Sequence, residues 1–134
     1  MQAASLLYKV THEAQYLTDA QNIAGAAYNK WFIPFNSAVL GESFQILEPG
    51  HVWFQAIMFR GFIELYKINN DRTYVTAYEK TLTHAWLSDC RNPGTHLLNG
   101  DFRGGTTQAS WEILHEGACV EMLARLASLE RDGL

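Results

Sequence analysis

Two side chains with metal-binding and nucleophilic potential share one predicted helix face. His115 and Cys119 are spaced i, i+4, the arrangement that one half of a zinc site would use. His84, Cys90 and His96 follow no matching spacing, so the other half of such a site has no counterpart in the sequence. Nothing marks either cysteine as a thiolate of lowered pKa. We therefore predict a buried thiol beside a packed imidazole, with no metal site, no cofactor and no cysteine nucleophile.

Polar residues that could bind a ligand lie in a glycine-rich segment and on one apolar helix. Asp101 and Arg103 lie within residues 99–105, where Asn-Gly-Asp and Gly-Gly are generic turn chemistry. They form either an ordinary surface ion pair or the mobile polar rim of a cleft. Gln55 interrupts an apolar helix, so its amide needs a partner from the core or from a ligand. Gly104-Gly105 lacks the Lys-Ser/Thr of a phosphate-binding loop.

Composition excludes several classes of protein. The 134 residues are 48% hydrophobic, 13% aromatic and 18% charged, which is typical of one globular domain. A net charge of −4 with scattered lysines and arginines gives no reason to expect a nucleic-acid partner. No apolar stretch is long enough to span a membrane. No signal peptide is visible, the two cysteines are interpreted as reduced thiols, and the cellular location stays open.

Apolar periodicity predicts an all-α protein, because strand signals are poor. Apolar stripes on one face predict helices over residues 16–31 and 72–87, and Pro34 stops the first of them. Asn70 or Asp71 is the expected N-cap of the second. Helices are also predicted over residues 51–68, apolar on nearly every side, and over residues 110–130. Residues 2–8 resemble the end of another helix. Helices that are apolar on one face alternate with helices that are apolar on several faces. This alternation indicates an outer and an inner layer.

An internal repeat organises these helices. Positions offset by 58 carry matching residues, namely Tyr8 with Tyr66, Tyr16 with Tyr74, Ala27 with Ala85 and Tyr28 with Trp86. Each repeat is one helical hairpin that needs stacked neighbours to bury its apolar face. The chain holds about two and a half hairpins, and six closing a ring would need roughly 350 residues. We expect residues 1–134 to form a single partial domain without its N-terminal hairpins. Its open edge would be covered by another copy or remain exposed.

An ordered set of segments resembles the family 76 glycoside hydrolases, the α-1,6-mannanase-like proteins. The matching segments are residues 39–42, 53–62, 65–66, 85–86, 100–104 and 116–123, together with Tyr74. The resemblance covers most of the chain and implies an (α/α)6 toroid with a central cleft, of which this chain is the C-terminal part. It also implies attack on α-1,6-linked mannan with retention of configuration. Family members are often secreted.

Departures from the family pattern leave the enzymatic status of this chain open. Gln55-Ala56 stands where the family usually has Lys-Gly, and Phe102 stands where it usually has Trp. The resemblance implies a catalytic pair of adjacent aspartates on an earlier inner helix. A retaining glycosidase needs two carboxyl groups about 5 Å apart, one as nucleophile and one as acid/base. No two aspartates are neighbours here. We therefore assign no catalytic residue and expect the chain alone to be inactive.

The resemblance implies an oligo- or polysaccharide ligand, which polar and aromatic side chains would bind. Trp53 and Trp111 open two inner helices, where an indole either stacks on a pyranose ring or packs in the core. Glu42 either contacts a sugar hydroxyl or caps a loop. The candidate substrate-binding residues are Glu42, Trp53, Gln55, Asp101, Arg103 and Trp111.

Two alternatives to a mannan-degrading role stay open. The first is a non-catalytic helical-repeat module that self-associates through its unfinished edge. The second keeps the toroid but changes the chemistry, since sugar epimerases and unsaturated-uronyl hydrolases share this hairpin architecture.

Overall fold

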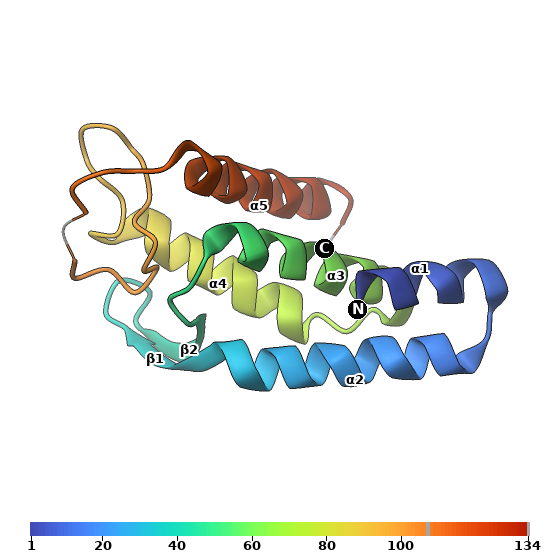
Figure 1. The fold of residues 1–134 in the computed structure, drawn as a ribbon. Helices are drawn as coiled ribbons and strands as arrows, with labels where there is room; N and C mark the ends of the chain where they lie inside the picture. The colour runs from blue at the N-terminus through green and yellow to red at the C-terminus, as the bar shows by residue number, and fades with distance from the viewer. Residues whose placement is uncertain (107, 134) are drawn as a thin grey trace.

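The computed structural model describes residues 1–106 and 108–133, which form helices and one β-hairpin (Figure 1). The elements in chain order are α1 (Gln2–Thr11), α2 (Ala14–Trp31), β1 (Phe32–Ser37), β2 (Glu42–Leu47), α3 (Val52–Asn69), α4 (Thr73–Leu87) and α5 (Ile113–Arg131). The helices predicted from periodicity are confirmed within a few residues. None of the helices in this described part of the chain has the length and hydropathy needed to cross a bilayer.

The helices pack in two layers, as their alternating apolar patterns predict. Helix α3 lies between α1 and α5 in one layer, whereas α2 and α4 cover α1 and α3 from the other (Figure 1). Tyr28 of α2 meets Tyr74 of α4 with ring centroids 5.2 Å apart, so the two outer helices are neighbours. Tyr78 is fully buried beneath α3, where its ring stacks on Phe59 at 4.3 Å. Its hydroxyl donates to the main-chain carbonyl of Gln55.

The 58-residue repeat is visible in the backbone. Helices α1 and α3 end at His12 and Asn70, which both adopt left-handed conformations, with φ of 58° and 56°. Each N–H donates to the carbonyl of the tyrosine four residues earlier, Tyr8 or Tyr66. Asn70 therefore ends α3 and does not cap α4. The N-cap position of α4 is Arg72, so the predicted cap at Asn70 or Asp71 is wrong by at least one residue. Asp71 nevertheless accepts the N–H of Thr73, the first residue of α4, with its Oδ1 at 3.0 Å.

The expectation of an all-α chain is wrong at residues 32–47. The antiparallel hairpin pairs Phe32 with Leu47 at one end and Ser37 with Glu42 at the other, and it packs over α4. Each strand has only six residues, so the period-2 signal is short and the apolar residues read as an irregular segment. The tertiary structure decides the outcome, because Ile46 and Leu47 bury their side chains against the helices.

Candidate functional site

Polar groups gather where the inner helices α3 and α5 begin. The long connection from α4 to α5, residues 88–112, lies at this end beside the segment that enters α3 (Figure 1). Side chains hold this connection in place. Asp89 Oδ1 accepts the Gly105 N–H at 3.0 Å, and buried Asn99 donates to the Thr106 carbonyl at 2.8 Å. These bonds order the described part of a connection that has almost no regular structure.

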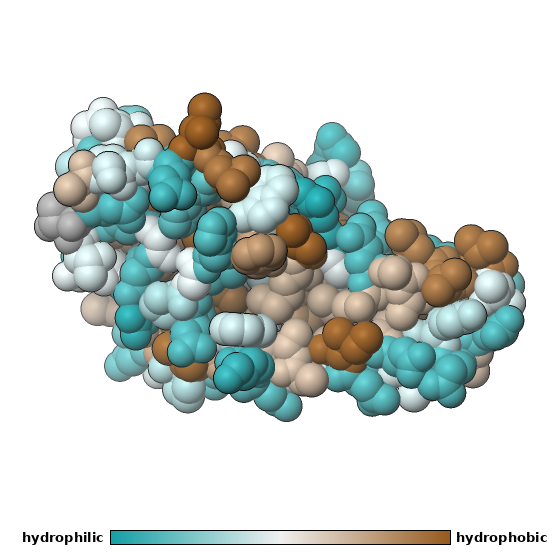
Figure 2. Space-filling view, viewed as in Figure 1, coloured by the Kyte–Doolittle hydropathy of each residue, from teal (hydrophilic) through white to brown (hydrophobic). Residues whose placement is uncertain are grey.

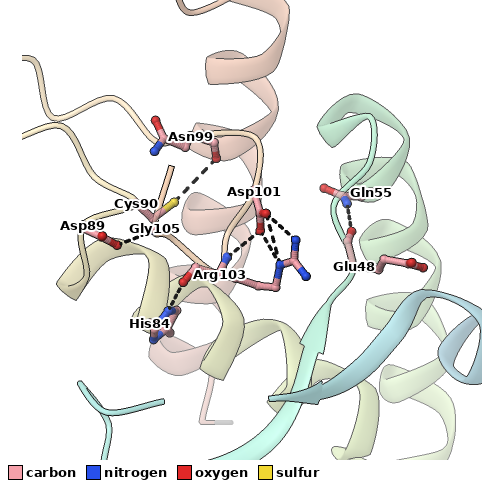
Figure 3. Close-up of polar contacts among 9 residues, drawn as sticks. All are labelled: Glu48, Gln55, His84, Asp89, Cys90, Asn99, Asp101, Arg103 and Gly105. Carbon is pink, nitrogen blue, oxygen red and sulfur yellow. Dashed lines mark hydrogen bonds and ion pairs between the residues drawn. The ribbon is translucent and has the colours of Figure 1, made fainter. Parts of the chain in front are cut away.

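Asp101 and Arg103 form a close ion pair within this connection. Arg103 Nη2 lies 2.6 Å from Asp101 Oδ2, and Arg103 Nε lies 2.9 Å from Asp101 Oδ1. This hydrogen-bonded pairing lowers the pKa of Asp101 and raises the pKa of Arg103. Figure 3 shows that the Arg103 guanidinium points toward the segment carrying Glu48 and Gln55. An ion pair that is still partly exposed presents both donors and acceptors to a ligand.

Gln55 lies across from this ion pair with one unused acceptor. Its side chain is 8% exposed, and its Nε2 donates to the Glu48 carbonyl at 2.9 Å (Figure 3). Its Oε1 is buried and has no hydrogen-bond partner in the described residues. The amide nitrogen therefore has the partner expected for a polar residue on an apolar helix, and the amide oxygen does not.

A buried hydrogen-bond chain links the glycine-rich segment to the hairpin through His84. Its Nε2 lies 3.1 Å from the Arg103 carbonyl, and its Nδ1 lies 2.7 Å from Ser37 Oγ. Since a carbonyl can only accept, Nε2 carries the proton, and in the neutral ring Nδ1 accepts from the Ser37 hydroxyl. The same hydroxyl accepts the Leu40 N–H at 3.0 Å. His84 therefore fixes the Arg103 backbone relative to the hairpin turn.

Trp111 lies just before α5, because this helix begins at Ile113 and not at residue 110 as predicted. The indole lines a small pocket of about 150 Å³, and its Nε1 is buried without a hydrogen-bond partner in the described residues. Asp89 and Asn99 line the same pocket as the indole. An aromatic ring beside such groups provides both stacking and hydrogen-bonding contacts.

The first turn of α5 adds two partly buried ionisable groups, His115 and Glu116. Burial lowers the pKa of His115 and raises the pKa of Glu116, although the latter accepts the Leu98 N–H at 3.3 Å. Gly100 packs against the His115 ring so closely that a Cβ there would meet it at 2.7 Å. His115 Nε2 and Glu116 Oε1 are both buried and have no hydrogen-bond partner in the described residues.

The two cysteines are buried, unpaired thiols. Burial raises the pKa of Cys90 to about 11 and the pKa of Cys119 to about 12. Protonated thiols are poor nucleophiles and poor metal ligands. Within residues 1–106 and 108–133, no three side chains of His, Cys, Asp or Glu are grouped to hold a metal ion.

The six candidate residues do not all meet. In Figure 3 Gln55 lies on the opposite side of this end from the Asp101–Arg103 pair and hydrogen-bonds to Glu48, and Trp111 lies on the same connection as the ion pair. Trp53 is half-buried on α3 with the Arg60 guanidinium 5.8 Å from its ring centre. Glu42 instead forms an ion pair with Lys80 of the outer helix α4 at 2.6 Å.

Several polar groups at this end were not predicted from the sequence to belong to the site. Asp89, Asn99 and His84 are separated in the chain, and only folding brings their hydrogen bonds to one connection. Glu116 follows His115 directly, so a search for polar residues at the start of the helix would have found it.

Comparisons with known proteins identify the family of this chain. The model of glycosyl hydrolase family 76 matches residues 1–127. A family 76 mannosidase, Bt3792 from Bacteroides thetaiotaomicron VPI-5482, is 54% identical with a TM-score of 0.97. The match covers 99% of this chain and 36% of that protein.

A family 76 glycoside hydrolase from a bovine Bacteroides thetaiotaomicron strain is 42% identical with a TM-score of 0.94. Here the match covers 96% of this chain and 27% of the other. The chain thus spans about a third of the length of these two structures. Among curated proteins, none matches. The family model covers nearly the whole chain, and the ordered segments found in the sequence agree with it: the chain belongs to glycoside hydrolase family 76.

Proposed function

We propose that this chain is part of an (α/α)6 toroid that acts on α-mannan or a related polysaccharide and that it supplies one wall of the substrate cleft. The observation that carries the proposal is the family 76 match over residues 1–127. The polar groups at the start of α3 and α5 support it, because a sugar presents many hydroxyls that both donate and accept. Asp101 and Arg103 face Gln55 across this end (Figure 3). Carboxylate, guanidinium and amide groups together match that hydroxyl chemistry.

In this proposal the chain contributes binding and not the acid–base step. Asp101 is held ionised by Arg103, which makes it a poor proton donor. Glu116 has a raised pKa, but its carboxylate is buried and accepts a backbone N–H. No aspartates are adjacent in the sequence. Two carboxyl groups at the spacing that retention requires would therefore come from another part of the polypeptide.

The binding role is tested by calorimetric titration of the full chain with an α-1,6-linked manno-oligosaccharide. Arg103→Ala removes charge-assisted hydrogen bonds and is expected to weaken binding at least about tenfold. Arg131→Ala is the matched control, because Arg131 forms a comparable short-range pair with Asp132 at the far end of α5. Equal losses in both variants, or no binding by the folded wild-type chain, would contradict the proposal. Robust release of reducing sugar by the chain alone would contradict the assignment of catalysis elsewhere.

A second candidate role is assembly with copies of itself. Large apolar side chains are exposed along α1 and at the outer surface of α5, for example Val10 at 81% and Val120 at 64%. Such exposure is characteristic of surfaces that bind other polypeptides. Light scattering separates the two roles, because a stable closed oligomer supports assembly and a monomer supports the cleft-wall proposal. The family match favours glycosidase chemistry over the epimerase and uronyl-hydrolase alternatives.

A further inference from the structure

Helix α3 carries a stripe of partly exposed side chains that face away from the outer helices. Trp53, Ile57 and Arg60 are spaced i, i+4 and i+7, so they lie on one side of this helix. Phe59 lies off the stripe, and its ring is the one that stacks on Tyr78 of the outer helix α4. Ile57 is 39% exposed, and the Trp53 and Arg60 side chains are partly exposed. The stripe is therefore a surface of the inner layer.

Helix α5 carries a second stripe beside the first. Ile113, Gly117 and Glu121 are spaced i, i+4 and i+8, so they too share one side of their helix. Ile113 is 91% exposed, and nothing lies within 4 Å of the position that a Cβ on Gly117 would take. Figure 2 shows apolar side chains, in brown, that project where α5 begins. The start of this stripe is therefore open space bordered by apolar surface.

An ion pair joins the two stripes. Arg60 donates from Nε to Glu121 Oε1 and from Nη2 to Glu121 Oε2, each at 2.6 Å. Arg125 donates from Nε to the same Oε1 at 2.7 Å, so two guanidinium groups share one carboxylate. The hydrogen bonds from Arg60 and then from Arg125 lower the pKa of Glu121 to about 2, so the carboxylate stays ionised near neutral pH. Bidentate pairing of this kind fixes the orientation of the Arg60 guanidinium.

Arg60 in turn orients Trp53. Its guanidinium lies 5.8 Å from the centre of the Trp53 ring, within the range of a cation–π contact. Arg60 follows Trp53 by two turns, about 10 Å along the helix axis, and a long helical side chain leans back toward the start of its helix. Contacts from Glu121 to Arg60 and from Arg60 to Trp53 therefore hold an indole in a fixed orientation at the start of α3.

The open space lies on the same side of the ion pair as this indole. Helices α3 and α5 both run away from the end that carries residues 88–112 (Figure 1). Trp53 lies two turns before Arg60, and Gly117 lies one turn before Glu121, so both lie toward that end. The space is thus bordered by a flat aromatic ring, an aliphatic side chain and charged hydrogen-bonding groups. A pyranose ring matches this border, because it offers C–H groups to the indole and hydroxyls to the charged groups.

We infer that Trp53 is the platform for one hexose ring, that the space beside Gly117 receives this ring, and that Arg60 and Glu121 are positioning residues that hold the platform. This inference rests on the proposed function, to which it adds a subsite between α3 and α5. The subsite is separate from the Asp101–Arg103 pair, which lies on the connection and not on a helix.

The test is fluorine NMR of the full chain with its tryptophans replaced by 5-fluorotryptophan, titrated with α-1,6-linked mannotriose. The Trp53 resonance is the one that is lost in Trp53→Phe. We expect the sugar to shift this resonance, and Trp53→Ala to weaken binding about tenfold. A Trp53 resonance that stays unchanged while the chain binds the sugar would overturn the inference and leave the proposed function standing. No binding by the folded chain would overturn both.

A larger residue at position 117 fills the proposed space without touching the scaffold. Because nothing lies within 4 Å of the new Cβ and leucine favours a helix more than glycine does, Gly117→Leu should not lower Tm. It should weaken binding at least about tenfold. Gly117→Ala is the control, since it also improves helical tendency but adds one methyl group, and it should weaken binding less than about threefold. Equal affinities of the two variants would overturn the inference.

Glu121→Gln tests the positioning role. It removes the charge that fixes Arg60, so it should shift or broaden the Trp53 resonance before sugar is added and weaken binding about threefold. Glu64→Gln is the matched control and should change neither, because Glu64 forms a 2.6 Å ion pair with Lys9 but lies three turns beyond Trp53. A Trp53 resonance that Glu121→Gln leaves unchanged would overturn the positioning role. A resonance that shifts with protein concentration and not with sugar would assign the space to a second copy of the chain and overturn the subsite.

Discussion

The connections that follow α2 and α4 occupy the same place in the repeat but are built differently. In the first connection, residues 32–47 form the β-hairpin, whose backbone groups pair with each other and whose end is anchored by buried Ile46 and Leu47. In the described part of residues 88–112 an isolated bridge joins Arg91 and Leu98, main-chain hydrogen bonds form turns, and side chains supply further bonds to the backbone. The repeat therefore fixes where a connection begins and ends, but not how its backbone polar groups are satisfied.

This difference separates scaffold from site. In the hairpin the backbone groups of the two strands pair with each other, and Thr81 Oγ1 of α4 also accepts the Leu47 N–H. In the second connection Asp89 and Asn99 bind the backbone, and Asp101 and Arg103 bind each other at the surface. His84 joins the two connections through Ser37 and the Arg103 carbonyl. The rigid hairpin thus supports the polar connection on which the proposed sugar contacts lie.

Removing the apolar anchor of the hairpin should have the largest effect. Leu47 is 1% exposed, so Leu47→Ala leaves a cavity and should lower the free energy of unfolding by about 2–5 kcal/mol. Urea denaturation followed by circular dichroism measures this change. Val39→Ala at the hairpin turn is the control, because Val39 is 48% exposed and should cost less than about 0.5 kcal/mol. Similar losses in both variants would show that the hairpin is not anchored by burial.

Glycines in the two connections should respond unequally to substitution. Gly104 (φ 80°) and Gly41 (φ 68°) both adopt left-handed conformations, so Ala should cost about 1–2 kcal/mol at either position. At Gly104 the new Cβ would also collide with the Asp89 carboxylate, whereas the space at Gly41 is open. Gly104→Ala should therefore cost about 1 kcal/mol more, through loss of the Asp89–Gly105 hydrogen bond. Urea denaturation of both variants is the measurement, and equal costs would refute the dependence on Asp89.

Removing the His84 side chain, which links the two connections, should have an intermediate effect on stability and should loosen both connections. His84 is 4% exposed, and His84→Ala leaves the Ser37 hydroxyl and the Arg103 carbonyl without this partner. We expect a loss of about 1–3 kcal/mol. Amide hydrogen exchange should quicken at Leu40 and around Arg103 together.

Exposed His96 provides the control for this link. His96→Asn retains a residue that tolerates the positive φ of 62° and should leave both regions unchanged. If His84→Ala quickens exchange on one side only, the coupling between the two connections is disproved.

The smallest effect concerns pH, and it should appear in the second connection. The pKa of Asp101 is lowered from its ordinary 3.8, so its ion pair stabilises the fold above that pH and is lost as pH falls below it. The pKa of Glu116 is raised from its ordinary 4.5, so ionisation of its buried carboxyl removes stability as pH rises above 4.5.

Single substitutions distinguish the two opposing dependences of stability on pH. In urea denaturation between pH 3 and pH 7, Asp101→Asn should remove the loss on the acid side, and Glu116→Gln should remove the loss on the neutral side. A pH profile that neither substitution changes would assign the dependence to other groups.

Much of the helical architecture was predictable, and the reason is local. Apolar residues recurring every three to four positions marked each helix, and the tyrosines offset by 58 marked the repeat. The repeat reappears in the backbone as the paired left-handed ends at His12 and Asn70. The hairpin was missed because two six-residue strands carry little periodic signal before they pair. The start of α5 was placed a few residues early, since Trp111 fits an apolar stripe but lies outside the helix.

The candidate site was predicted only in part. The glycine-rich segment identified Asp101 and Arg103, and the break in an apolar helix identified Gln55. Glu42 was grouped with them, yet its carboxylate pairs with Lys80, 38 positions away. Long-range partners of this kind leave no mark in the spacing of neighbouring residues.

The sequence by itself determined the helices, the repeat that spaces them and the family to which they belong. Each of these depends on residues within one or two turns of each other or on an ordered set of such segments. Only the tertiary structure decided the pairing of the hairpin, the bridge through His84 and the pairing of Glu42 with Lys80. The physical reason is that burial and packing choose the partners of polar groups far apart in the chain.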